Sequence, residues 1–146
     1  MTLALQKVLA PAAGESESRL NLDVVFTSVE PTLAALKKAG DLASRLNARI
    51  TLVVPQIVPY PLPLKTPPVL IEFNERRFRV IASQCPVAMT VRIYLCRDPV
   101  ETLAAVLKPD SIVILGGRRR WWPTAEKRLA RELRRVGHEV IFTEME

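Results

Sequence analysis

The sequence predicts an α/β protein built on an open parallel β-sheet, and two patterns lead to this prediction. Short apolar runs rich in β-branched residues alternate along the chain with longer segments of helical periodicity. The clearest unit spans residues 110–142, where an apolar run, two glycines, a basic amphipathic segment and a second apolar run follow one another. At 146 residues the chain is long enough for one domain with a full core.

Five segments have the composition of β-strands. Four are short and mainly apolar, and the first two of them are expected to be buried strands. The third segment in chain order alternates between apolar and polar residues, which predicts an edge strand. The predicted strands are Leu22–Thr27, Ile50–Val54, Met89–Leu95, Ile112–Leu115 (the central strand) and Glu139–Thr143.

The first two helices follow the first two strands. Pro31 suits the first turn of a helix, and an apolar stripe continues to about Leu46, where Asn47 is a good left-handed stop. Pro55 is expected to end the second strand. A stiff loop without regular structure is then predicted over 56–68, and the second helix runs from there to about residue 83.

The last two helices carry clearer end signals. Asp98 is expected to cap a short helix over Val100–Leu107. Thr124 is expected to cap the final helix, which Gly137 stops after Val136. Residues 1–20 read as a flexible arm because prolines, alanines and serines dominate after residue 10, so we expect the folded domain to span 21–146.

Composition limits the possible functions. Hydrophobic residues make up 49% and charged residues 25%, as in ordinary globular proteins, and no apolar run approaches the ~20 residues that span a bilayer. Cys85 and Cys96 fit packing roles in a reduced compartment, so we expect a cytoplasmic protein. A single histidine, with no CxxC or HExxH pattern, predicts no metal site.

The chain is basic, with a net charge of +6, and the excess is concentrated near its end. Residues 118–135 contain eight basic side chains and two acidic ones, a difference equal to the charge of the whole chain. A polyanion is therefore a candidate partner. The alternative is that the basic residues simply form the solvated face of the last helix.

The candidate site lies where strands end and helices begin, as ligands of open α/β sheets do. Gly116-Gly117 is expected to form a turn, either merely a tight turn or an anion cradle completed by Arg118, Arg119 and Arg120. Thr27 and Ser28 would lie across the same crevice, with helix capping as their alternative role. The candidate anion- or nucleotide-binding set is Thr27, Ser28, Val54, Gly116, Gly117, Arg118, Arg119 and Arg120.

Trp121 and Trp122 are the least expected residues of this region. The favoured interpretation is that one fills the core or a dimer seam while the other covers the mouth of the pocket. The alternative is a platform beside the arginines that stacks bases or meets a membrane surface. No RNA-binding or helix-turn-helix pattern accompanies the pair.

Three passages resemble the universal stress protein (UspA-like) family: SVEPTLAALKKAGDLASRLNARITLVV, YLCRDPVETLAAVL and PDSIVILGGRRR. The resemblance covers about Asn21–Glu144. It implies a three-layer α/β/α fold of the adenine nucleotide alpha hydrolase-like type, with a five-stranded parallel sheet of order 3-2-1-4-5. It also implies a stress-response role and a homodimer joined through the last strand, Glu139–Thr143.

The departures from the family pattern concern its nucleotide site. Nucleotide-binding members carry an acidic residue where Thr27 stands, and a G-x-x-G loop followed after nine residues by G-S/T. Here Gly116 matches the first glycine, Arg119 replaces the second, and no G-S pair follows. Because glycines allow backbone amides to approach phosphates closely, we expect no bound cofactor, and an ATP site so degenerate that it binds an anion or nucleotide weakly or not at all.

The expected function is therefore a non-catalytic regulatory or interaction module. His138 has no serine or cysteine nucleophile in a recognisable elbow near it, and the sequence offers no paired acid and base. The alternative function is a nucleic-acid-binding module that uses the Arg118–Trp122 loop and the basic last helix.

Overall fold

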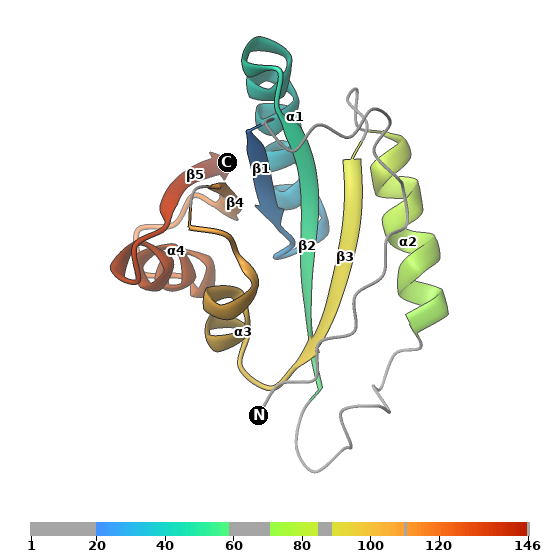
Figure 1. Ribbon diagram of the computed structural model, residues 1–146. Helices are drawn as coiled ribbons and strands as arrows, with labels where there is room; N and C mark the ends of the chain where they lie inside the picture. The colour runs from blue at the N-terminus through green and yellow to red at the C-terminus, as the bar shows by residue number, and fades with distance from the viewer. Residues whose placement is uncertain (1–19, 59–70, 85–88, 110, 146) are drawn as a thin grey trace.

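The protein folds around one parallel sheet. The structure is a computed structural model that describes residues 20–58, 71–84, 89–109 and 111–145. All neighbouring strands are parallel, and their order is β3-β2-β1-β4-β5 (Figure 1), as expected for this fold class. The strands are β1 (Asn21–Val25), β2 (Arg49–Ile57), β3 (Met89–Cys96), β4 (Ile112–Arg118) and β5 (Glu139–Met145).

In the described residues, four helices cover the sheet in two layers. Helices α1 (Val29–Leu46) and α2 (Ile71–Ser83) pack on one face, and α3 (Pro99–Val106) and α4 (Ala125–Arg135) pack on the other (Figure 1). Each interface has its own cluster of buried apolar side chains. In the described part of the chain, no helix is long and apolar enough to cross a membrane.

The strand order places a topological switch point at the centre of the sheet. From β1 the chain winds outward to β2 and β3, then returns past β1 to form β4 and β5. Crevices at the carboxyl ends of the strands beside such a point are the usual ligand sites of open α/β sheets. The carboxyl ends of β1 and β4 are therefore where the site should be sought.

Short-range signals in the sequence place the helix ends. The Asp98 carboxylate accepts a hydrogen bond from the amide of Val100 at 3.0 Å, and the Thr124 hydroxyl accepts one from the amide of Lys127 at 3.2 Å. Asn47 takes the left-handed conformation at the end of α1, with φ of 52°. These three predictions are confirmed, because capping depends on residues within one helical turn.

The second strand corrects one prediction. β2 does not end at Pro55 but continues to Ile57, and Pro55 pairs with Tyr94 of β3. Val53, two residues earlier, accepts a hydrogen bond from the amide of Phe26 on the β1 side. Pro55 faces the same side, beyond the end of β1, so its missing N–H removes no bond from the sheet. The part of the predicted loop at 59–68 lies outside the described residues.

The fourth strand corrects another prediction. Gly116 and Gly117 do not form a turn: they belong to β4, which pairs with β5 as far as Arg118. A Cβ on Gly116 would lie 2.0 Å from the carbonyl oxygen of Pro31, in the first turn of α1. The glycine therefore lets the strand pass directly beneath the helix. β5 likewise extends beyond the predicted end at residue 143.

Most of the predicted arm, residues 1–19, lies outside the described residues, as does Cys85. Leu20 is described and already belongs to the domain, because its carbonyl accepts a hydrogen bond from the amide of Arg49 at 2.9 Å. Cys96 is fully buried, and burial raises the pKa of its thiol. It therefore has the packing role expected of it.

A buried carboxyl group lies on the sheet away from the carboxyl ends of the strands. Asp23 is only 5% exposed, and its Oδ1 accepts a hydrogen bond from the side-chain amide of Asn21 at 2.7 Å. Burial raises the pKa of Asp23, although hydrogen bonds from Ser111 and Asn21 and the charges of Arg92 and Lys108 partly oppose it. The folded protein therefore holds a proton on Asp23 more tightly than the unfolded chain does.

We expect Asp23→Asn to flatten the pH dependence of stability. Folding raises the pKa of Asp23, so protonated Asp23 favours the folded state and ionised Asp23 does not. The free energy of unfolding of the wild type therefore falls as the pH rises above the unfolded pKa of about 3.9. In urea unfolding, the stability of the variant relative to wild type should be greater at pH 7 than at pH 4. Asp41→Asn, at an exposed position on α1, is the matched control. An equal stability difference at both pH values would contradict the prediction.

Candidate functional site

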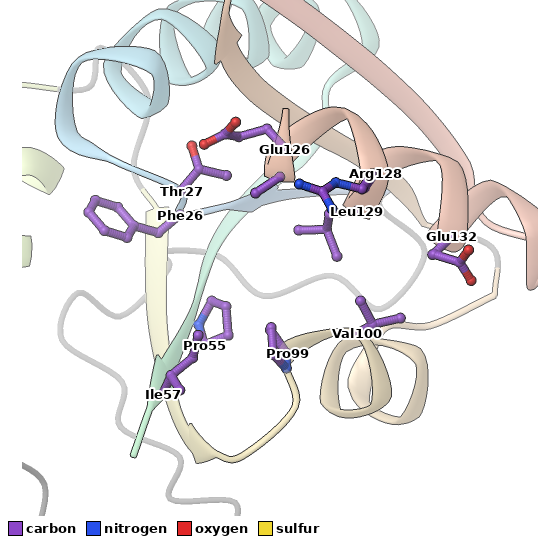
Figure 2. Close-up of a pocket in the computed structure, with 11 residues that line it drawn as sticks. Phe26, Thr27, Pro55, Ile57, Pro99, Val100, Glu126, Arg128, Leu129 and Glu132 are labelled. Atoms are coloured by element: carbon purple, nitrogen blue, oxygen red, sulfur yellow. The ribbon is translucent and has the colours of Figure 1, made fainter. Parts of the chain in front are cut away.

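A cavity of about 550 Å³ opens at the carboxyl ends of β1 and β2, between α3 and α4. Figure 2 shows its wall: Phe26 and Thr27 follow β1, Pro55 and Ile57 end β2, and Pro99 and Val100 begin α3, with α4 opposite. The volume lies within the range of small-molecule sites. The α4 wall consists of Ala125, Glu126, Arg128, Leu129 and Glu132.

A hydrogen bond joins the ends of β1 and β4 beside this cavity. The Thr27 hydroxyl donates a hydrogen bond to the carbonyl oxygen of Gly116 at 2.9 Å. The backbone amide of Thr27 donates a hydrogen bond to the Thr32 hydroxyl at 3.1 Å. The two strand ends are thus joined directly at the point where the sequence predicted an anion cradle. Thr27 is the one member of the predicted site that lines the cavity.

An ion pair makes a second connection across the same strand ends. The guanidinium group of Arg118 binds the Glu30 carboxylate on the first turn of α1. Both side chains are substantially exposed, so the pair adds little stability. It does hold the first of the three arginines against a carboxylate of the protein rather than leaving it free for an external anion.

The remaining predicted site residues do not converge on one point. Ser28 occupies the N-cap position of α1, but its side chain makes no capping hydrogen bond. Val54 is 3% exposed and packs in the core on the α1 and α2 side. Gly117 lies in the β4–β5 ladder, and the backbone amide of Arg119 bonds to the carbonyl of Met145 at 2.7 Å. The side chain of Arg120 lies over the ring of Trp122.

The two tryptophans correct the favoured prediction as regards the core and the pocket mouth, while its dimer-seam alternative stays a prediction. Neither fills the core: Trp121 is 91% exposed and Trp122 is 47% exposed. Their rings meet edge to face, with centroids 5.4 Å apart. Neither residue covers the 550 Å³ cavity, and together with Pro123, Lys127 and Arg131 they line a separate hollow of about 290 Å³.

Charged groups on the wall of the larger cavity come from α4. Glu126 is half-buried and stands beside β4, since a Cβ on Gly117 would lie 3.3 Å from its own Cβ. Glu132 already forms an ion pair with Arg135 at 3.6 Å. Arg128 is exposed. The charged residue beside Thr27 in Figure 2 is therefore Glu126, a carboxylate.

Sequence reasoning missed most of the cavity wall. The rule that ligands bind at the carboxyl ends of strands points to Phe26 and Pro55, but β2 was expected to end at Val54, three residues before its actual end at Ile57. Pro99 follows the capping residue Asp98, where a proline suits the start of a helix, so the sequence gives no sign that it also lines the cavity. No sequence signal marks Leu129 or Glu126, because which side of α4 faces the cavity depends on how the helix packs.

Comparison with known proteins gives a structural match only. No protein-family model matches the sequence, and no curated protein is significantly similar to it. Solved structures do match most of the chain, and three of them are universal stress proteins. A universal stress protein family member from Burkholderia pseudomallei is 20% identical, with a TM-score of 0.58, over 88% of this chain and 98% of its own.

Two further structures agree. A universal stress protein solved in complex with cAMP is 15% identical, with a TM-score of 0.57, over 85% of this chain and 95% of its own. The universal stress protein UspA from Lactobacillus plantarum is 18% identical, with a TM-score of 0.54, over 87% of this chain and 99% of its own. Together with the strand order, these matches identify the chain as having the fold of the universal stress proteins.

Proposed function

We propose that the chain is a non-catalytic regulatory module of the universal stress protein family, whose nucleotide crevice is closed at the phosphate end. One observation carries the proposal: the hydrogen bond from Thr27 to the Gly116 carbonyl joins the strand ends between which an anion would have to enter. The cavity beside them keeps the size of a ligand site. Its occupant would meet apolar walls rather than a cradle of backbone amides.

Charge at the closed end also disfavours a nucleoside triphosphate. Glu126 stands beside Thr27 and Gly117, and Arg118 is engaged by Glu30. Two like charges 4 Å apart repel each other by about 4 kcal/mol at the effective dielectric constant of a protein surface. A phosphate seated near Glu126 would therefore have to overcome this repulsion.

The proposed module acts in the cytoplasm as a homodimer joined through Glu139–Thr143 of β5. This strand lies at one edge of the sheet, and edge strands can pair with a second chain. Its Val140 carbonyl accepts a hydrogen bond from the Arg134 side chain at 3.0 Å. Residues Ile141, Phe142 and Thr143 are only half-buried in the single chain. Pairing with a second copy would cover them.

A thermal-shift titration tests the closed crevice. A ligand at 100 times its Kd stabilises a protein by about 2.7 kcal/mol, which is a shift of several degrees for a domain of this size. We expect millimolar ATP to shift the melting temperature by less than about 1 °C. One fold neighbour was solved with cAMP, so cAMP and AMP belong in the same titration.

Inorganic tripolyphosphate is the control, because it measures anion binding to the basic surface without a nucleoside. Equal small shifts with ATP and tripolyphosphate would indicate binding to the basic surface rather than to the cavity. A shift of several degrees with ATP that tripolyphosphate does not reproduce would overturn the proposed closure.

A second candidate function is binding of single-stranded nucleic acid by the surface around Trp121. An aromatic side chain that is 91% exposed beside cationic residues is a feature that core packing does not explain. Stacking of bases on such side chains, with lysine and arginine holding the phosphates, is how many proteins bind single strands. The hollow beneath the tryptophans places Lys127 and Arg131 within reach of a stacked nucleotide.

A further inference from the structure

The wall of the 550 Å³ cavity combines a large apolar surface with few polar groups. Its apolar part comes from β2, α3 and α4 and from Phe26, which directly follows β1, so its shape is held mainly by the sheet and the helices. Apolar walls with few polar groups are typical of sites for small organic ligands, in which the polar groups select the ligand. The charge of those groups is therefore the informative property. The apolar residues are Phe26, Pro55, Ile57, Pro99, Val100, Ala125 and Leu129.

Of the three charged residues on the wall, only Glu126 combines partial burial with a place at the closed end. Glu132 is engaged by Arg135, and Arg128 is exposed. Among the residues that the structure describes, no hydrogen bond or ion pair is formed by the Glu126 carboxylate. Figure 2 shows it beside the hydroxyl end of Thr27, whose own proton is donated to Gly116.

From this arrangement we propose that the cavity binds a small aromatic or apolar ligand carrying a protonated amine, with the ammonium group at the Glu126 carboxylate and the ring against Phe26, Pro55 and Leu129. A half-buried carboxylate is stabilised by a cation and destabilised by a second anion. The preference is opposite to the one that the net charge of +6 creates for the molecule as a whole. This inference rests on the proposed function, because it takes the cavity as a site that excludes polyphosphates.

Three matched probes separate the contribution of the ring from that of the charge: tryptamine, indole-3-propionate and 3-methylindole. They share an indole ring and carry a positive, a negative and no charge at neutral pH. Binding to the full-length protein is measured by two-dimensional NMR, with the amides of Thr27, Val100 and Leu129 as reporters. We expect tryptamine to bind at least about tenfold more tightly than indole-3-propionate, which corresponds to 1.4 kcal/mol.

Glu126→Gln is the test variant, and Glu101→Gln, at an exposed position on α3 that does not line the cavity, is its matched control. Because Glu126 is only half-buried and glutamine has the same shape, both variants should keep the wild-type circular dichroism spectrum. We expect Glu126→Gln to reduce the preference for the amine over the acid to less than about threefold while 3-methylindole binds as before. Glu101→Gln should keep the wild-type preference.

Three outcomes would overturn the inference: the acid binding as well as the amine, an amine preference unchanged in Glu126→Gln, or no binding of any probe at its solubility limit. None of these outcomes bears on the proposed closure of the crevice, which only tight binding of ATP would contradict. The two proposals can therefore be rejected separately.

Discussion

Replacing Gly116 with alanine is expected to destabilise the domain by roughly 3 kcal/mol or more, toward the upper end of overpacking effects. The added Cβ would lie 2.0 Å from the carbonyl oxygen of Pro31 and 2.6 Å from its carbonyl carbon. Both are backbone atoms of α1, so neither can rotate away. Either the first turn of α1 or the end of β4 must move, and the Thr27 hydrogen bond to Gly116 would be lost with it. Urea unfolding of wild type and variant measures the effect.

Gly117→Ala is the matched control for this experiment. Its Cβ would lie 2.6 Å from Cζ of Phe142, which is the far end of a half-buried side chain that can rotate. We expect a clearly smaller loss of stability, about 1 kcal/mol. If both substitutions had the same effect, or if Gly116→Ala were neutral, the close approach of α1 to β4 would not explain the glycine. A ligand-binding role for Gly116 would then deserve a new test.

Replacing Trp121 with alanine is expected to weaken binding of single-stranded DNA by about 5- to 100-fold without changing stability by more than about 0.5 kcal/mol. The first figure follows from the roughly 1–3 kcal/mol that stacking on an aromatic side chain contributes per base. The second follows because the side chain is 91% exposed and supports no core residue. Fluorescence anisotropy of a labelled oligothymidylate at low salt gives the affinity.

The salt dependence of the same binding tests the arginines. Arg119→Gln with Arg120→Gln removes two charges but spares Arg118, which pairs with Glu30. Each phosphate contact to a single strand contributes about 0.7 to the slope of log K against log salt, so the double variant should lower the slope by about 1.4. The double variant Lys37→Gln, Lys38→Gln makes the same charge change on the exposed side of α1 and should lower the slope much less. No binding of the wild type at low salt would end this candidate function.

The sequence predicted where the candidate site lies but not which residues form it. Sequence reasoning located the carboxyl ends of the strands and included Thr27, but it assigned the chemistry to Gly116, Gly117 and the three arginines. In the structure the glycines are strand residues, and their missing side chains make room for Pro31 and Phe142. The sequence does not distinguish a glycine that permits a turn from one that permits close packing. The distinction depends on which residue packs against the glycine in the folded structure.

The sequence by itself determined the order of the elements and most of their ends. Asp98 and Thr124 cap helices and Asn47 ends one, because each acts on amides or dihedral angles within a few residues. The strand order also followed once the passages around α1, α3 and β4 were recognised together.

Tertiary structure decided everything that depends on contacts between distant segments. Thr27 and Gly116 are 89 residues apart in the chain, and only the pairing of β1 with β4 brings the hydroxyl within 2.9 Å of the carbonyl. The exposure of Trp121 and the position of Glu126 depend in the same way on how α4 and the loop before it lie against β4. Such contacts arise from packing between segments, and local sequence preferences carry no record of them.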